Sequence, residues 1–230
     1  MIDANAARVV FDDIDSTNAE AARLAATGDV GPYWIRATRQ SAGRGRRGRS
    51  WTSEPGNLYV TYLGASPKPP GEIALLSFAA ALAVADIADH VIGRPTALLK
   101  WPNDVLIVGR KVAGILLESG ALKDGALKDG RTWLAVGIGI NVASAPSDVN
   151  QPIAALAAVT GAKAITLDAL EALLRRRLAF WAGCLERDGF APLREAWLAR
   201  AHGLGSQVVA RLGDEEVTGV MCGQIGRAHV

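Results

Sequence analysis

Residues 39–51 read RQSAGRGRRGRSW, a run with five arginines, three glycines and no acidic residue. Glycines let a loop take up positive φ angles and approach a ligand closely. Arginines are forked donors that suit carboxylate and phosphate groups. The run therefore predicts a loop that closes over a small anionic ligand. From this run alone, a solvent-exposed basic loop or a nucleic-acid patch remains an equal alternative.

The rest of the chain is close to neutral in charge. This favours a local site for a small charged ligand over a nucleic-acid-binding surface. The 230 residues include 25 Lys and Arg and 23 Asp and Glu, a net charge of +2, whereas nucleic-acid-binding domains usually carry a broader basic excess. The N-terminus has no apolar signal peptide. The apolar run 73–85 is too short to span a bilayer and predicts a buried helix. Two distant cysteines, Cys184 and Cys222, indicate unpaired thiols of a cytoplasmic protein.

The sequence pattern predicts alternating strands and helices. Thr17-Asn-Ala-Glu20 reads as a capping box that opens a helix. A hairpin turn is expected at Gly109-Arg110, a hinge at 203–205, and a surface loop where ALKDG repeats over 121–130. The strands are expected at 9–14, 33–38, 58–63, 97–101, 105–108, 111–118, 133–141, 207–212 and 216–221, and the helices at 17–26, 72–91, 167–185 and 192–202.

A second segment, LKWPNDV at 99–105, places polar groups at the end of a strand. Pro102 ends the strand because it lacks an N–H donor and fixes φ. Asn103 and Asp104 can then meet a ligand or a metal, although Asp104 alone is more often a turn residue. Lys111 begins an otherwise apolar strand and needs an anionic partner if it is buried. The alternative is an edge lysine that points to solvent.

A third segment, VGIGINV at 136–142, has the spacing GxGxN. It is not a dinucleotide fingerprint, because no helix follows at once and no acid lies about twenty residues on. Glycine inside a strand lets a ligand lie against the sheet backbone. A bulge or a close strand contact is the alternative.

Taken together, these segments resemble a biotin protein ligase over roughly residues 8–221. The matching motifs occur in the family's order: Ser16-Thr-Asn18, Gln40 with 43–49 and Trp51, Lys100 to Asp104, Arg110 to Leu116, and Gly137-x-Gly-x-Asn141. The resemblance implies an α+β fold, with a mixed β-sheet flanked by helices as in class II aminoacyl-tRNA synthetases. It also implies a C-terminal SH3-like barrel, incomplete here.

The resemblance implies a two-step reaction that uses ATP and Mg²⁺, with biotin as substrate. Biotin's carboxylate attacks the α-phosphate of ATP to give biotinyl-5′-AMP, and a lysine of a biotin carboxyl carrier protein then attacks this mixed anhydride. A lipoate or octanoate ligase or transferase of related fold is the nearest alternative. A nucleic-acid-binding module is a more distant one.

The same resemblance implies roles for particular residues. The expected catalytic residues are Lys111, Arg46 and Arg44, and the expected Mg²⁺ ligand is Asp104. The expected nucleotide-binding residues are Arg46, Arg47, Trp51, Asn103 and Asn141. The expected biotin-binding residues are Ser16, Thr17, Asn18, Gln40, Gly43, Arg44, Gly45, Arg46, Lys111, Gly114, Gly137 and Gly139. Thr17 can serve as helix cap as well as ligand contact, and ligand contact is favoured for Ser16. The arginine loop is expected to open without ligand and to close over it.

The expected domains are a catalytic domain over 1–203 and a truncated SH3-like domain over 204–230. Residues 223–230 leave the family pattern and resemble translated adapter DNA, so an artefactual end is expected. Ser16 lies too near the start for an N-terminal DNA-binding domain. We therefore expect a cytoplasmic ligase that binds neither DNA nor membrane and is a monomer or a homodimer.

Overall fold

The computed structural model describes residues 2–121, 131–147, 151–159, 162–212 and 215–223. Its centre is a seven-stranded mixed sheet in the order β1-β2-β3-β7-β6-β5-β4. Only β1 and β2 among these strands pair in parallel. The strands are β1 Ala7–Ile14, β2 Tyr33–Gln40, β3 Leu58–Ser66, β4 Ala97–Lys100, β5 Asp104–Ile107, β6 Arg110–Ala121 and β7 Thr132–Ile140.

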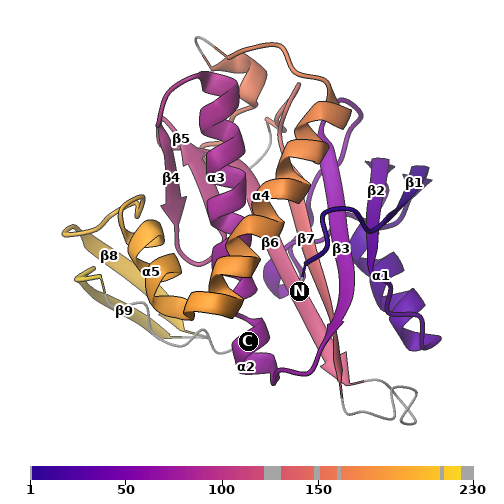
Figure 1. Ribbon diagram of the computed structural model, residues 1–230. Helices are drawn as coiled ribbons and strands as arrows, with labels where there is room; N and C mark the ends of the chain where they lie inside the picture. Colours follow the sequence, from indigo (N-terminus) through magenta and orange to yellow (C-terminus); the bar gives the residue numbers. More distant parts are fainter. Residues whose placement is uncertain (1, 122–130, 148–150, 160–161, 213–214, 224–230) are drawn as a thin grey trace.

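Helices cover both faces of the sheet (Figure 1). Side chains alternate between the two faces of a strand, so Trp34 of β2 joins the larger core and Ile35 joins the smaller one. The larger core lies under α3 and α4, which pack side by side, and the smaller one lies under α1. The helices are α1 Thr17–Ala26, α2 Pro70–Ile73, α3 Leu76–Ile92, α4 Leu167–Asp188 and α5 Phe190–Leu198.

The apolar stretch Pro70–Ile92 passes a length and composition test for a membrane-spanning helix among the described residues. It is mostly buried, and α3 lies at the centre of the larger core, in contact with α4 and the sheet. This arrangement is that of a core helix and fits the buried helix that the sequence predicts.

A separate two-stranded sheet follows α5. It consists of β8 Gln207–Leu212 and β9 Glu215–Val220, which pair antiparallel. In Figure 1 it lies beside α5, on the side of the molecule that carries β4. The mixed sheet with flanking helices confirms the expected fold class, and this small sheet stands where the SH3-like barrel was expected. The boundary at residue 203 stays a prediction.

Several local predictions were wrong. The helix expected over 72–91 is broken at residues 74–75 into α2 and α3. The helix expected over 192–202 begins at Phe190 and ends at Leu198. The hairpin turns at Val108-Gly109, which both have positive φ (48° and 70°), as a two-residue type I′ turn requires. The predicted ALKDG loop (121–130) and the predicted tail (223–230) lie outside the described residues, except for Ala121 and Gly223.

Candidate active site

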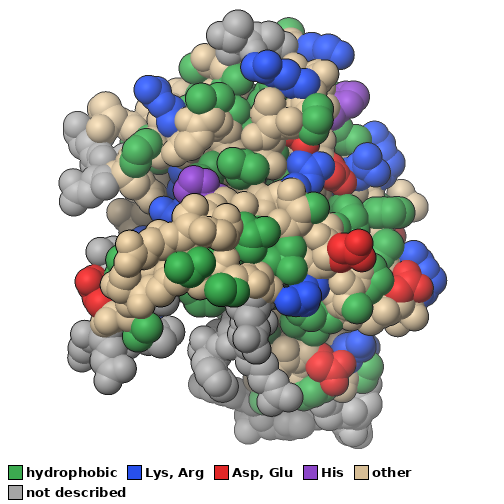
Figure 2. All heavy atoms as spheres, turned by 90° about the vertical axis from the view of Figure 1, so that its left-hand side faces the viewer, with side chains coloured by type: hydrophobic (Ala, Val, Ile, Leu, Met, Phe, Trp, Pro, Cys, Tyr) green, Lys and Arg blue, Asp and Glu red, His purple; other side chains and the backbone are tan. Residues whose placement is uncertain are grey.

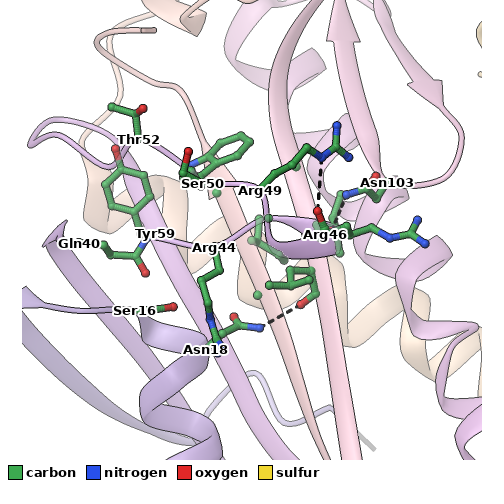
Figure 3. Close-up of a pocket in the computed structure, with 18 of the residues that line it drawn as sticks. Ser16, Asn18, Gln40, Arg44, Arg46, Arg49, Ser50, Thr52, Tyr59 and Asn103 are labelled. Carbon is green, nitrogen blue, oxygen red and sulfur yellow. Dashed lines mark hydrogen bonds between the residues drawn. The ribbon is translucent and has the colours of Figure 1, made fainter. Parts of the chain in front are cut away.

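A cavity of about 210 Å³ opens over the middle of the sheet. Its floor is formed by β7 and β6, one end by the start of α1, and its cover by the arginine loop that joins β2 to β3. Figure 3 shows Ser16, Asn18 and Gln40 at one end of this cavity and Arg46 and Asn103 at the other. The sheet therefore brings together segments that lie about 100 residues apart in the sequence.

The polar end is built where α1 begins. Ser16, not Thr17, is the N-cap: its Oγ accepts a hydrogen bond from the Ala19 N–H at 3.4 Å, which satisfies one of the helix's open donors. Thr17 lies in the first turn, and its backbone N–H and hydroxyl donate to Gln40 Oε1 at 2.8 and 3.1 Å. Gln40 Nε2 donates in turn to Ser53 Oγ at 2.8 Å. The capping-box prediction for Thr17 is therefore wrong.

Two rows of residues cross the sheet beneath the cavity. In one row Thr61 of β3, Gly137 of β7 and Leu116 of β6 are register partners. A Cβ on Gly137 would collide with the amide of Asn18, so the missing side chain leaves room for that amide. At this row the bare backbone carries a protein side chain, and contact of Gly137 with a ligand stays a prediction.

The neighbouring row carries an indole ring. Gly139 and Gly114 are register partners, and a Cβ on either would meet the Trp51 ring at 2.7 and 3.0 Å. Lys111 Nζ lies 5.1 Å from the centre of the same ring, within cation–π range. The buried Trp51 Nε1 has no hydrogen-bond partner among the described residues. The Trp51 ring therefore packs on the sheet beside the cavity with a buried donor that has no partner in the described part of the chain.

The arginine loop forms a hydrogen-bonded turn. The Trp51 N–H donates to the Gly43 carbonyl at 2.8 Å, and the Gly45 N–H donates to the Arg49 carbonyl at 2.6 Å. A Cβ on Gly43 would overlap the Trp51 carbonyl and Ser53 Oγ, so glycine is needed for this close crossing. Arg47 has a φ of 57°, a conformation that is uncommon for a residue with a side chain. Opening of the loop without ligand stays a prediction.

The cationic end centres on a largely buried ion pair. Lys111 Nζ lies 2.7 Å from Asp104 Oδ1, and the two side chains are 11% and 16% exposed. The expectation that Lys111 needs an anionic partner is confirmed, and the solvent-facing alternative is wrong. Burial lowers the pKa of the nearby Arg46 guanidinium, and the charges of Arg47 and Arg49 lower it further. A guanidinium in this setting gains much from an incoming anion.

The two asparagines expected at the nucleotide are held by backbone carbonyls. Asn103 Nδ2 donates to the Ile115 carbonyl at 2.8 Å, and Asn141 Nδ2 donates to the Ala154 carbonyl at 3.3 Å. Both side chains line the cavity. Each of these hydrogen bonds uses one of the two amide N–H groups, so the backbone holds both side chains in place and each can still offer a donor or its amide oxygen to a ligand.

Most of the expected site residues line the cavity, and their roles stay predictions. Gly43, Arg47 and Asp104 do not: Gly43 is buried within the loop, Arg47 is exposed, and Asp104 is paired with Lys111. The residues that do are Ser16, Thr17, Asn18, Gln40, Arg44, Gly45, Arg46, Trp51, Asn103, Lys111, Gly114, Gly137, Gly139 and Asn141.

Sequence reasoning missed three residues of β3 and β6. Tyr59 lines the cavity and donates to the Glu54 carbonyl at 2.9 Å, and burial raises the pKa of its hydroxyl to about 12. Thr61 is wholly buried and bonds Asn18, and Glu118 bonds Asn18 and Arg44. The available signal was the two-residue period, which places Tyr59 and Thr61 on one face of β3.

The comparisons with known proteins agree with one another. The model of the biotin/lipoate A/B protein ligase family matches residues 11–141. A biotin–[acetyl-CoA-carboxylase] ligase from Paracoccus denitrificans is 44% identical over 91% of this chain and 87% of its own length. Its namesake from Mycobacterium tuberculosis is 33% identical over 89% of this chain and 75% of its own length.

Among solved structures, the biotin protein ligase from Aquifex aeolicus in complex with biotin and ATP matches with a TM-score of 0.75 at 28% identity. The match covers 93% of this chain and 85% of that one. The resemblance drawn from the five sequence motifs is thereby confirmed. This chain belongs to the biotin/lipoate A/B protein ligase family, among its biotin protein ligases.

Proposed function

We propose that this protein catalyses the ATP-dependent ligation of biotin to a lysine of a biotin carboxyl carrier protein, through biotinyl-5′-AMP. The observation that carries the proposal is one cavity with a polar end at Ser16 and Asn18 and a cationic end at Arg46 and Lys111. The two ends match the two ends of biotin, a ureido ring and a carboxylate.

The polar end favours biotin over lipoate or octanoate. A ureido ring offers two N–H donors and one carbonyl acceptor, and the buried side chains of Ser16 and Asn18 can pair with such groups. A lipoyl or octanoyl tail offers no such groups there. An apolar tail there would leave the remaining lone pairs of Ser16 Oγ and Asn18 Oδ1 without a donor, which is unfavourable.

The cationic end suits the first step. A carboxylate oxygen of biotin attacks the α-phosphorus of ATP, the bond to the β-phosphate oxygen breaks, and pyrophosphate leaves. The two reacting groups are anions that repel each other, so Lys111 and Arg46 hold them together and offset the charge that develops. Both side chains line the same cavity, and we assign them to the carboxylate and the α-phosphate, with Arg44 beside them.

Asp104 fits a Mg²⁺ site that has few protein ligands and is completed by phosphates and waters. Within the described residues no three His, Cys, Asp or Glu side chains gather as a metal cage. Mg²⁺ on a nucleotide usually takes one or two carboxylates together with phosphates and waters, and Asp104 beside Lys111 can supply one. Bound there, the ion would neutralise phosphate charge. Asn103, Asn141, Arg47 and Trp51 are assigned to the nucleotide.

In the second step the carrier's lysine amine attacks the carbonyl carbon of the mixed anhydride, the bond to AMP breaks, and an amide forms. This step needs a partner protein of the biotin carboxyl carrier type. We further propose that the protein acts in the cytoplasm as a monomer or homodimer, without DNA or membrane binding. On the face shown in Figure 2, basic side chains are scattered rather than gathered into one patch, so this face does not favour nucleic-acid binding.

The test is exchange of labelled pyrophosphate into ATP, which isolates the first step and needs no carrier protein. We expect exchange with biotin and none with lipoate or octanoate. Lys111→Met should abolish it, whereas Lys68→Met, at a lysine that is 44% exposed and pairs with Glu72, should leave it unchanged. Exchange with lipoate or octanoate but not with biotin would contradict the assignment.

A further inference from the structure

We propose that Thr61 and Glu118 are positioning residues that fix which end of the Asn18 amide faces the ureido ring. The inference rests on the proposed function and goes beyond it, since neither residue is needed for the steps above. Thr61 has no exposed surface, yet it carries a hydroxyl in the middle of the sheet. A buried hydroxyl needs hydrogen-bond partners, and its partners are residues of the polar end.

The hydrogen bonds around Asn18 determine its orientation. Its Oδ1 carries no hydrogen, so the Thr61 hydroxyl donates in the 2.7 Å contact between them. Asn18 Nδ2 donates to Glu118 Oε2 at 2.7 Å and to the Leu116 carbonyl at 3.3 Å. An amide has two N–H donors and two acceptor lone pairs. Both donors are used, so Asn18 can only accept a hydrogen bond from a ligand.

The surroundings prevent the amide from turning to another position. Asn18 is 4% exposed and lies on the bare Cα of Gly137. Thr61 Oγ1 also lies 2.8 Å from Thr17 Oγ1 at the start of α1. Since the Thr61 hydrogen is used at Asn18, this contact is a hydrogen bond when the Thr17 hydroxyl donates to Thr61 in place of Gln40, which the Thr17 backbone N–H also serves. Glu118 also lies 3.5 Å from Arg44 Nη2 of the arginine loop. The carboxylate therefore keeps its acceptor oxygen at the amide nitrogen.

The fixed amide makes a specific prediction about the ligand. A ring N–H directed at Asn18 can donate a hydrogen bond to Oδ1. A ring oxygen at the same place has no hydrogen to donate, and its lone pairs would face the lone pair of Oδ1. Without the Thr61 hydroxyl or the Glu118 carboxylate, one end of the amide loses its hydrogen-bond partner, so the energetic preference for the observed orientation falls and the amide nitrogen faces the ligand more readily. Thr61 and Glu118 would thus control selectivity for an N–H, as well as affinity.

Two cyclic carbamate analogues of biotin provide the probe, each with one ureido N–H replaced by an oxygen. Affinities for biotin and both analogues would be measured by titration calorimetry on the whole protein and on Thr61→Val, Thr61→Ser and Glu118→Leu. The wild type should reject one analogue at least about tenfold relative to biotin. In Thr61→Val and Glu118→Leu this ratio should fall to within about threefold, and Thr61→Ser should keep the wild-type ratio.

The measured affinities distinguish failure of the positioning role from failure of the proposed function. If the variants weaken biotin and the analogue by the same factor, the residues only support the fold and the inference is overturned. If the wild-type protein binds no biotin in the same titration, the proposed function itself fails. Glu118→Leu guards against a misfolded Thr61 variant, because the Glu118 side chain is 32% exposed and its replacement leaves the core intact.

Discussion

The Lys111–Asp104 pair allows a quantitative test of how the cationic end is built. Two unit charges 2.7 Å apart attract by about 6 kcal/mol at an effective dielectric constant of 20. Burial costs each ion several kcal/mol and offsets much of this attraction. Removing one partner leaves the other charge buried without compensation, so a single substitution should destabilise more than the pair stabilises.

We expect Lys111→Met and Asp104→Asn each to lower the free energy of unfolding by about 3 kcal/mol. A protein of this size loses about 2–4 °C in Tm for each kcal/mol, so each variant should melt about 6–12 °C lower. The double variant should be more stable than the sum of the two changes implies, with a coupling energy of about 2 kcal/mol.

The assay is urea unfolding of the wild type, both single variants and the double variant without ligand at pH 7. The exposed pair Lys68–Glu72, at 3.4 Å with side chains 44% and 55% exposed, is the control cycle and should give about 0.3–0.5 kcal/mol. A coupling energy for Lys111 and Asp104 no larger than this control would refute the reasoning.

Three further predictions follow from single contacts. Asn57 Oδ1 accepts three backbone N–H bonds at 2.8–3.2 Å, so Asn57→Ala should cost about 3 kcal/mol in urea unfolding; a loss below about 1 kcal/mol would contradict this. Gly137→Ala should weaken biotin binding at least about tenfold by displacing the amide that packs on it, whereas Gly219→Ala, a strand glycine with open space around it, should not. The hydrogen bond from Arg23 lowers the pKa of Asp15 from 3.8 to about 2. That stabilisation is present above pH 3.8 and is lost as pH falls through 2. Because the Asp15 side chain is 45% exposed, Asp15→Asn should cost less than about 1 kcal/mol at pH 7, and the difference from wild type should vanish only below pH 2.

The sequence predicted the strands and helices well because their signals are local. All nine predicted strands are present, and the leucine stripe from Leu167 to Leu185 lies within α4. The break between α2 and α3 was missed because residues 74–75, Ala and Leu, carry no helix-breaking signal. The order of the sheet could not be read from local patterns either, since β3 pairs with β7 about 75 residues further along the chain.

A site residue could be predicted from the sequence where its polarity conflicts with that of its neighbours. Lys111 on an apolar strand required an anion, and Asp104 supplies it. Thr61 gave no such signal, because threonine is common in strands and its role depends on a helix that begins 44 residues earlier. The contact of Trp51 with Gly114 and Gly139 likewise depends on strand register, which single-sequence patterns do not fix.

The charged side chains of the site affect how anionic ligands and Mg²⁺ bind to it. Without ligand, Asp104 neutralises Lys111 and Glu118 lies near Arg44. An incoming carboxylate or phosphate must compete with these two acids for the cations. If an anion takes Lys111, Asp104 is left as a largely buried carboxylate without its partner, which is unfavourable unless another cation arrives. We therefore expect pyrophosphate to bind more tightly with Mg²⁺ than without it in calorimetry, and this gain should disappear in Asp104→Asn; an equal gain in both proteins would exclude Asp104 as the group that couples them.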